Sequence, residues 1–163
     1  MHKFQEKVDL TYEQFFRRVL ETKVQLAREL EQVLGRKKAF EVIDKAQEKI
    51  ARNWVKQMKE SHSINSFDDF VKVMKKVLSS PMRQHTATLT IQEETPKKLS
   101  LCTTECLRAK IFKEMNATDL GYLMFCHQDD KTSRDFHPKI KFERTKNLMG
   151  GDDCCDHTYY LEE

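Results

Sequence analysis

Glycine and proline are scarce in this chain of 163 residues, which contains four glycines and three prolines. This composition excludes collagen-like and low-complexity chains, and it favours regular helices and strands. No stretch approaches the roughly 18 consecutive apolar residues of a transmembrane helix, and residues 1–7 lack the apolar centre of a signal peptide. We therefore expect a cytoplasmic protein with no membrane partner.

A strong charge of either sign is also missing. The 29 basic and 26 acidic side chains are interleaved along the chain and give a formal net charge of +3. No run of lysine or arginine carries aromatic residues spaced to stack on bases. The charges are typical of a solvated surface, and we expect no nucleic-acid partner.

No Cys-x-x-Cys pair occurs, and the five cysteines are an odd number for a set of disulfides. Cytoplasmic thiols stay reduced. The cysteines are therefore expected to be buried thiols, metal ligands or nucleophiles.

Residues 11–80 have the periodicity of helices, because apolar residues recur there at helical spacing in three runs. Thr11 with Gln14, and Ser66 with Asp69, have the spacing of capping boxes at the starts of two of these runs. Gly35 is predicted to end the first helix.

This helical half is predicted to be scaffold and is a candidate homodimer interface. Its large aromatic side chains, Trp54 and the pair Phe15 and Phe16, are expected to be buried.

The pattern changes near residue 81. Alternating residues predict strands at 86–91, 99–102, 140–145 and 155–161, with a turn at 95–98 and a hairpin-type turn at 150–153. Helices are predicted at 104–115 and 118–126. This order predicts an α+β fold, in which a helical N-terminal half packs with an antiparallel sheet and the later helices. We expect a single domain over residues 1–163, with a helical part at 1–80 and an α+β part at 81–163.

Three short blocks in the second half place thiols beside polar side chains. Cys106 lies near the start of a predicted helix, where the positive end of the helix dipole would favour a thiolate. Cys126 and Asp129 would share a helix face if that helix continues. Cys155 and His157 would share a face of the last strand.

Three interpretations of these blocks stay open. The cysteines can be small buried hydrophobes, which we expect for Cys102 and Cys154. They can bind a metal such as zinc, for which there are four candidate ligands, Cys106, Cys126, Cys155 and His157. They can also take part in nucleophilic or acid–base catalysis with a neighbouring imidazole or carboxylate.

The blocks and their neighbours resemble the C-terminal half of the L-2-amino-thiazoline-4-carboxylic acid hydrolase family of small bacterial proteins. That pattern has a cysteine before a helix, Cys-x-x-Asp after the next helix, an Arg-Thr strand and Gly-Asp-x-x-Cys near the end. The matching residues are Cys106, Cys126, Asp129, Arg144, Thr145, Gly151, Asp152 and Cys155, and His157 matches the closer relatives. A fainter similarity links the chain to 4-vinyl-reductase-type ligand-binding domains.

The family resemblance implies a hydrolase that opens a cyclic amidine-type C–N bond in a small carboxylated substrate. The catalytic residues that it implies are Cys126, Asp129, His157 and Cys155. Cys126 would be the nucleophile or a metal ligand, Asp129 would orient a partner or act as a base, and His157 would carry protons.

The resemblance also implies four substrate-binding residues, Arg144, Thr145, Cys106 and Asp152. Arg144 would pair with the substrate carboxylate through two parallel hydrogen bonds. The alternative function is a small-molecule-binding or sensing domain without turnover, which would hold a metal through the same cysteines. In either case the expected partner is a small molecule.

Overall fold

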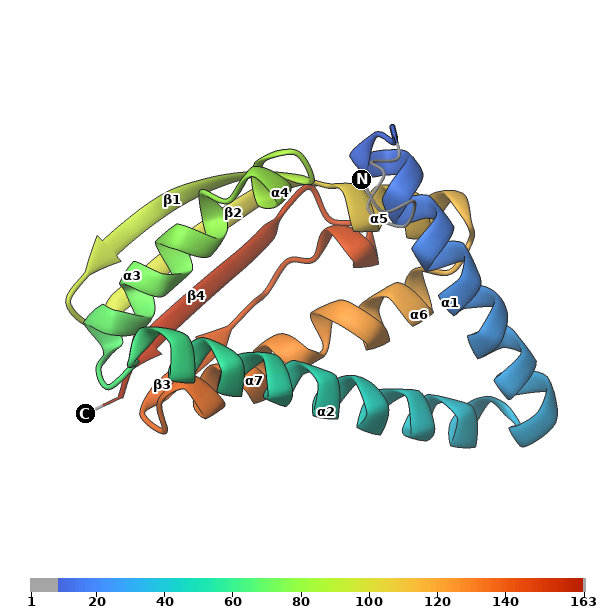
Figure 1. Cartoon of the computed structure of the whole chain (residues 1–163), viewed down its shortest axis with the longest axis horizontal. Coiled ribbons are helices and arrows are strands. Elements are labelled where there is room, and N and C mark those ends of the chain that lie inside the picture. The colour runs from blue at the N-terminus through green and yellow to red at the C-terminus, as the bar shows by residue number, and fades with distance from the viewer. Residues whose placement is uncertain (1–8, 163) are drawn as a thin grey trace, which may run out of the picture.

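The computed structural model describes residues 9–162 and confirms the α+β fold (Figure 1). The first half contains α1 (Tyr12–Leu34), α2 (Arg36–His62), α3 (Phe67–Leu78) and the short α4 (Pro81–Gln84). Two strands and a helix follow, β1 (Ala87–Thr95), β2 (Lys98–Cys106) and α5 (Leu107–Glu114). The rest consists of α6 (Thr118–Gly121), a π-helix (Tyr122–Cys126), α7 (Gln128–Phe136), β3 (Ile140–Glu143), a 3-10 turn (Leu148–Gly150) and β4 (Cys155–Leu161).

The ends of the first helices lie where the local sequence predicts them. The Thr11 side chain accepts a hydrogen bond from the Gln14 backbone, and the Gln14 side chain accepts one from Thr11 in return. Gly35 adopts φ 76° and ψ 150°, a conformation that favours glycine, and it lets α2 begin directly after α1. Ser66 caps α3 by accepting a hydrogen bond from the backbone of Asp69 at 3.1 Å.

The four strands form one antiparallel sheet in the order β1-β2-β4-β3. Because side chains alternate along a strand, the register divides the central strands β2 and β4 between two faces. The inner face, as we define it, carries Leu99, Leu101, Thr103, Cys155, His157 and Tyr159. The outer face carries Ser100, Cys102, Asp156, Thr158 and Tyr160.

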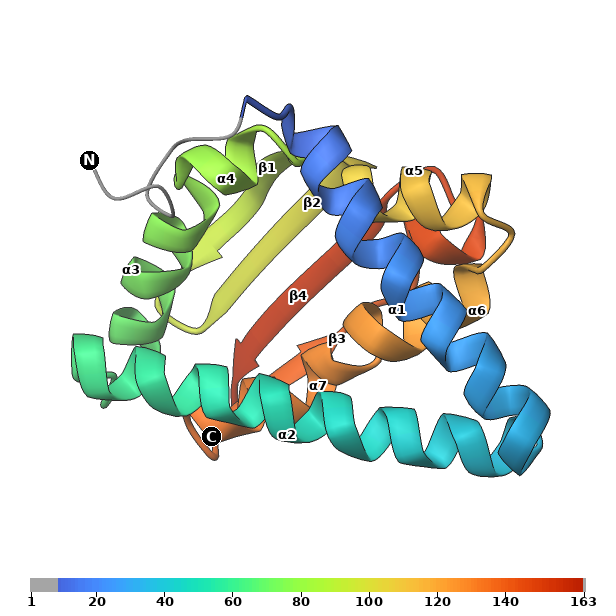
Figure 2. The same ribbon diagram turned by 45° about the vertical axis from the view of Figure 1, so that its right-hand side comes forward.

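The helices pack on the inner face, and Figure 2 shows α1 and α2 on the viewer's side of the sheet. Two apolar clusters form the core there. The first cluster joins α1, α2, α5, α6 and the π-helix to Cys155, and the second joins α2, α3 and α7 to Leu99, Leu101 and Tyr159. His157 lies opposite Leu101, between the Cys155 row and the Tyr159 row. The inner face therefore has a polar residue at the seam between two apolar clusters.

The predicted burial of two aromatic side chains is wrong. Phe15 is 53% exposed and Trp54 is 41% exposed, whereas Phe16 packs against the first cluster. Other large apolar side chains of α1 are also exposed, including Leu26 and Val33. The core covers only one side of α1, so these residues stay outside it. The homodimer interface stays a prediction.

Several predicted element boundaries are also wrong. β1 continues to Thr95 instead of ending at 91, and β3 ends at Glu143 instead of 145. β2 continues to Cys106 because its last residues pair with the start of β1, and α5 therefore begins only at Leu107. The connection between β3 and β4 is a long loop with a 3-10 turn rather than a tight hairpin. The helix after Cys126 does continue as α7, and β4 has the predicted bounds.

No helix within residues 9–162 has the length and apolar character needed to span a membrane. The cytoplasmic location and the single-domain organisation stay predictions.

Candidate functional site

Three polar side chains from different elements meet at the seam of the inner face. Asp129 lies in the first turn of α7, Arg144 follows β3 directly, and His157 lies in β4. Arg144 Nη1 is 2.7 Å from Asp129 Oδ2, and His157 Nε2 is 3.6 Å from the same oxygen. The Arg144 and His157 side chains are only 9% and 14% exposed. One partly exposed carboxylate thus lies beside both a guanidinium and an imidazole that are themselves largely buried.

Arg144 is held entirely by groups of the protein. Besides its ion pair, its Nη2 donates a hydrogen bond to the Cys126 carbonyl oxygen at 3.1 Å. Its guanidinium lies 5.6 Å from the Tyr122 ring centroid and 5.5 Å from that of Phe142. Burial opposes the charge of Arg144, but the Asp129 carboxylate holds the pKa of Arg144 above its ordinary value.

The π-helix carries Cys126 at its last position. It is closed by a hydrogen bond from the His127 backbone to the Tyr122 carbonyl at 2.9 Å. Such widened turns are frequent at functional sites. Just before it, a Cβ atom at Gly121 would lie 2.6 Å from Met149 Sδ and 2.7 Å from Phe112 Cγ. Glycine therefore allows the 3-10 turn to pack closely here.

The thiols near this site are not activated. Burial, followed by the Asp129 carboxylate, raises the pKa of the Cys126 thiol to about 12. Burial also raises the pKa of Cys155, although the Leu148 backbone N–H donates to its sulfur at 3.2 Å. Both residues are therefore protonated thiols at neutral pH, and neither is the reactive thiolate that a cysteine nucleophile needs.

Cys106 connects the site to a neighbouring pocket of about 530 Å³. It lies close enough to Cys155 to influence the charge of that thiol. The pocket is walled by α4, the start of β1, the end of β2 and α5, and its lining includes His85, Glu105, Cys106, Lys110 and Leu148. Access to the thiols from this side would pass Cys106.

Thr145 and Asp152, predicted to contact substrate, hold the loop between β3 and β4. The Asp156 carboxylate accepts hydrogen bonds from the backbone N–H groups of Thr145 at 2.9 Å and Lys146 at 2.6 Å. The Asp152 carboxylate accepts one from the Asn147 backbone at 2.6 Å. These contacts fix the loop that carries Arg144, and the substrate contacts of Thr145 and Asp152 stay a prediction.

The L-2-amino-thiazoline-4-carboxylic acid hydrolase family matches residues 12–159. The chain belongs to this family. The match includes the helical half, which the sequence motifs alone did not cover. No functionally curated protein matches the chain.

A solved structure with a similar fold is the crystal structure of the phenol-responsive sensory domain of the transcription activator PoxR with phenol. The TM-score is 0.55 at 10% identity, and the match covers 96% of this chain and 77% of that chain. At this identity the likeness shows the fold alone.

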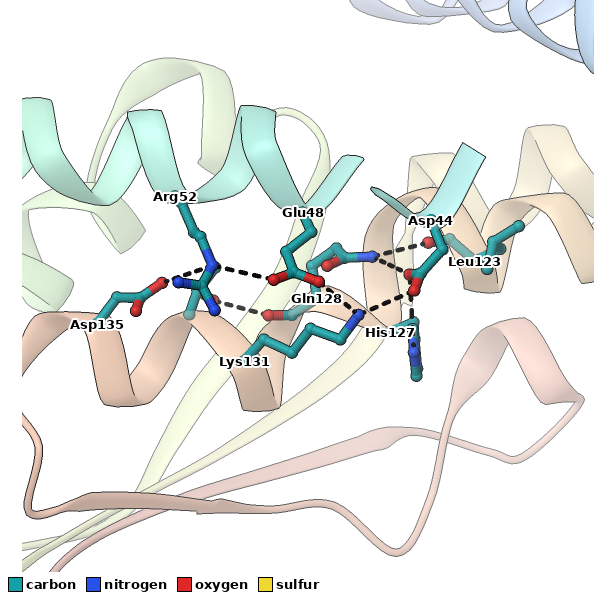
Figure 3. Close-up of polar contacts among 9 residues, drawn as sticks. Asp44, Glu48, Arg52, Leu123, His127, Gln128, Lys131 and Asp135 are labelled. Atoms are coloured by element: carbon teal, nitrogen blue, oxygen red, sulfur yellow. Dashed lines mark hydrogen bonds and ion pairs between the residues drawn. The ribbon is translucent and has the colours of Figure 1, made fainter. Parts of the chain in front are cut away.

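In this family member, α2 holds α7 through a polar network that the sequence motifs did not reveal (Figure 3). Gln128 Nε2 donates to Asp44 at 2.7 Å, and Lys131 Nζ lies 2.9 Å from Asp44 and 3.1 Å from Glu48. His127 Nε2 lies 3.7 Å from Asp44. The i,i+4 spacing of Asp44 and Glu48 on a helix was the one available signal. Through these contacts the N-terminal half positions the helix that carries the site carboxylate.

Sequence reasoning also missed Arg108, whose side chain is partly buried in α5 and packs on the Phe16 and Phe125 rings. Its neighbours in the sequence gave no signal, because the face of a short helix that is buried depends on tertiary packing.

The two cysteines expected to be buried hydrophobes, Cys102 and Cys154, are only partly buried. Cys102 lies on the outer face because it alternates with Leu101 and Thr103 along β2. Cys154 precedes β4, and its thiol lies beside that of Cys102.

The residues do not form an evident metal site. Within the part of the chain that the structure describes, no three His, Cys, Asp or Glu side chains are grouped so that they could hold a metal ion. The zinc site predicted from Cys106, Cys126, Cys155 and His157 stays a prediction, and no chemical step below uses it.

Proposed function

We propose that this protein hydrolyses a cyclic amidine-type C–N bond in a small carboxylated substrate, with L-2-amino-thiazoline-4-carboxylate as the first candidate. The observation that carries the proposal is the buried His157 imidazole beside the Asp129 carboxylate, in a chain that belongs to this hydrolase family. A carboxylate that orients an imidazole is a recurring arrangement in general acid–base catalysis.

His157 has the central role in this proposal. Its imidazole takes a proton from a water molecule as the water oxygen adds to the amidine carbon. Asp129 stabilises the imidazolium that results. The imidazolium gives this proton to the ring nitrogen of the adduct. The ring C–N bond then breaks as the added hydroxyl becomes a carbonyl, and the imidazole passes the hydroxyl proton to the departing nitrogen, which leaves as an amine. Because the carbon keeps its bond to the ring sulfur, the product from the thiazoline is S-carbamoyl-cysteine, and the imidazole returns to its starting state.

Water is the nucleophile in this scheme, in place of Cys126. A thiol with a pKa of about 12 would have to lose its proton before it could attack. Cys126 contributes instead a neutral thiol beside the reacting group, and Cys155 contributes a second one. Their burial excludes water from one side of the site.

The experiment is incubation of the purified full chain with L-2-amino-thiazoline-4-carboxylate, with carbamoyl-cysteine measured by liquid chromatography and mass spectrometry. His157→Gln should lower kcat by about 10²- to 10⁴-fold, the usual contribution of a general acid–base group. His62→Gln, at the end of α2, is the matched control and should retain activity. Activity of His157→Gln at the wild-type rate would exclude this mechanism.

A second function, binding of a small molecule without turnover, is supported by the fold shared with the phenol-responsive sensory domain. Calorimetric titration with phenol and with the thiazoline carboxylate separates the two functions. Saturable binding with no product favours sensing, and product formation favours hydrolysis. Metal analysis of protein purified without chelator tests whether the four candidate ligands, Cys106, Cys126, Cys155 and His157, hold zinc.

A further inference from the structure

One side of α1 carries large apolar side chains that the rest of the described chain leaves uncovered. Leu26 is 63% exposed and Val33 is 78% exposed, and Phe15 and Val19 are exposed as well. α1 packs on α2 and α5 (Figure 2). The α1 side chains that belong to the first core cluster or pack against it are different ones, namely Phe16, Leu20, Val24, Ala27 and Leu30. The exposed apolar side chains therefore form a second face of the same helix.

This second face has the spacing of a surface on which helices pair. Steps of four and three residues alternate along it, which keeps its side chains in a narrow strip that another helix can cover. We call this strip the α1 stripe, and its residues, all exposed, are Phe15, Val19, Thr22, Leu26, Glu29 and Val33. Because α1 has 23 residues and is about 34 Å long, a helix laid on the stripe would contact it over several turns.

The charged side chains of α1 divide between the same two faces. On the core side, Arg28 pairs with Asp119 at 2.9 Å. Within residues 9–162, no ion pair is formed by three charged side chains on or beside the stripe, which are Arg18, Glu21 and Glu29. An occupant of the stripe can therefore place opposite charges beside these three groups.

A second copy of α1 supplies both the apolar contacts and the charges. When two stripes are laid antiparallel, Phe15 of one copy lies opposite Leu26 of the other. Arg18 then lies within about one turn of Glu21 and Glu29 of the second copy. Each contact occurs twice, because a two-fold axis relates the two copies.

Other occupants fit the charges less well. A parallel copy would place Arg18 opposite Lys23 of the second copy and Glu29 opposite its own equivalent, so like charges would meet in both places. An anionic membrane surface attracts helices whose polar face is rich in lysine and arginine, whereas two of the three charged side chains at the stripe are acidic. The side chains therefore favour the antiparallel pair.

We propose that this protein forms a two-fold dimer in which the α1 stripes of two copies pack antiparallel. The stripe contains none of the candidate site residues, so the dimer does not depend on the proposed hydrolysis. One helix from each copy makes an interface at the small end of the specific range, and Thr22 and Glu29 interrupt its apolar surface. We therefore expect a dissociation constant of about 10 µM.

The test measures the mass of the full chain by sedimentation velocity. At about 100 µM, tenfold above the expected constant, the wild type should have a mass close to twice the 19.4 kDa of the chain. Leu26→Glu should raise the dissociation constant at least about 100-fold, because each dimer loses two central apolar side chains, and should leave a monomer at this concentration. Its circular dichroism spectrum should match that of the wild type, since Leu26 is exposed.

Ile50→Glu is the matched control, because Ile50 is 57% exposed on α2 and lies outside the stripe. This variant should remain a dimer. If Leu26→Glu does not fold, Val19→Ser removes another stripe residue by a smaller change and should also weaken the dimer.

Charge reversal tests the direction of the two helices. Arg18→Glu should raise the dissociation constant about tenfold in an antiparallel pair, because it would face Glu21 and Glu29 of the second copy. Adding Glu21→Arg and Glu29→Arg to the same chain should restore the wild-type constant. In a parallel pair, Arg18→Glu would instead tighten the dimer, because it would face Lys23.

Four results would overturn the proposal. They are a wild-type monomer at about 100 µM, a Leu26→Glu variant that still forms the dimer, an Ile50→Glu variant that is monomeric, and an Arg18→Glu variant that dimerises more tightly. The third result would move the interface to α2, and the fourth would make the helices parallel.

Discussion

The two faces of the sheet use the same residue types in different ways. On the inner face, Cys155 and His157 lie among buried side chains, and His157 faces the Asp129 carboxylate. On the outer face, Cys102 lies opposite Asp156, whose carboxylate accepts the backbone hydrogen bonds of a loop. One residue of register in β4 thus separates Cys155, in the candidate site, from Asp156, whose carboxylate holds a loop.

Solvent access explains most of this difference. Helices cover the inner face, so each charge there needs a partner, and Arg144 and Asp129 supply one another. On the outer face, water can satisfy what the protein does not. Charged groups on the inner face therefore depend on partners within the protein. Substitutions there should change stability and reactivity more than substitutions on the outer face.

The largest difference between the two faces is expected in the reaction rates of their cysteine thiols. At pH 8, Cys126 should react with iodoacetamide about 10³-fold more slowly than a free cysteine, because its pKa is about 12 against an ordinary value near 8.5. Cys154, whose pKa burial and the Cys102 thiol raise to about 11, should react about tenfold faster than Cys126. Mass spectrometry of timed samples gives each rate, with the chain unfolded in urea as the reference. Equal folded and unfolded rates at Cys126 would mean that its thiol is neither buried nor near a carboxylate.

Asp129→Asn should have the largest effect on stability. It would leave Arg144 buried beside a neutral amide, at a cost of about 1–3 kcal/mol in the free energy of unfolding. Because the Asp129 side chain is 35% exposed, water can enter and the lower part of this range is expected. Urea unfolding followed by circular dichroism measures the change. Asp153→Asn removes an exposed partner of Lys146 and should leave the unfolding midpoint unchanged. Equal midpoints for both variants would remove the structural role of the Asp129–Arg144 pair.

Gly121→Ala tests how tightly the inner site is packed. A methyl group at this position would collide with Met149 and Phe112, and overpacking of this kind costs about 1–3 kcal/mol. Part of the clash is with the flexible end of Met149, so a shift of the 3-10 turn should accompany the loss. Gly150→Ala, where a Cβ meets nothing within 4 Å, is the control. Thermal melts of the two variants should differ by several degrees, and identical melts would show that the turn can move freely.

The sequence predicted local features better than contacts between distant segments. The caps at Thr11 and Ser66 and the bounds of β4 depend on neighbouring residues and were found. The extension of β2 to Cys106 depends on pairing with β1, which local propensity does not encode. The exposure of Phe15 depends in the same way on which side of α1 the core covers.

The candidate site follows the same rule. The motifs named Asp129, Arg144 and His157, and Asp129 does lie beside both of the others. The role expected of Arg144 changed once its contacts were known. Its guanidinium already donates a hydrogen bond to Asp129, whereas no described carboxylate pairs with Arg108. A motif identifies which residue types recur, whereas the partner of a buried charge becomes visible only in three dimensions.

The smallest effects are expected for two threonine-to-valine changes, one on each face of the sheet. On the outer face, the Thr158 and Ser100 hydroxyls lie 3.1 Å apart, and water can replace either partner. Thr158→Val should therefore change the free energy of unfolding by less than about 0.5 kcal/mol. On the inner face, Thr103→Val removes a buried hydroxyl that has no partner, so it should stabilise the ligand-free protein by up to about 1 kcal/mol. Urea titrations of both variants give the difference and its sign. A loss of stability in Thr103→Val would mean that this hydroxyl is satisfied in solution, by water or by a ligand carried through purification, and the two faces would then differ less than the structure indicates.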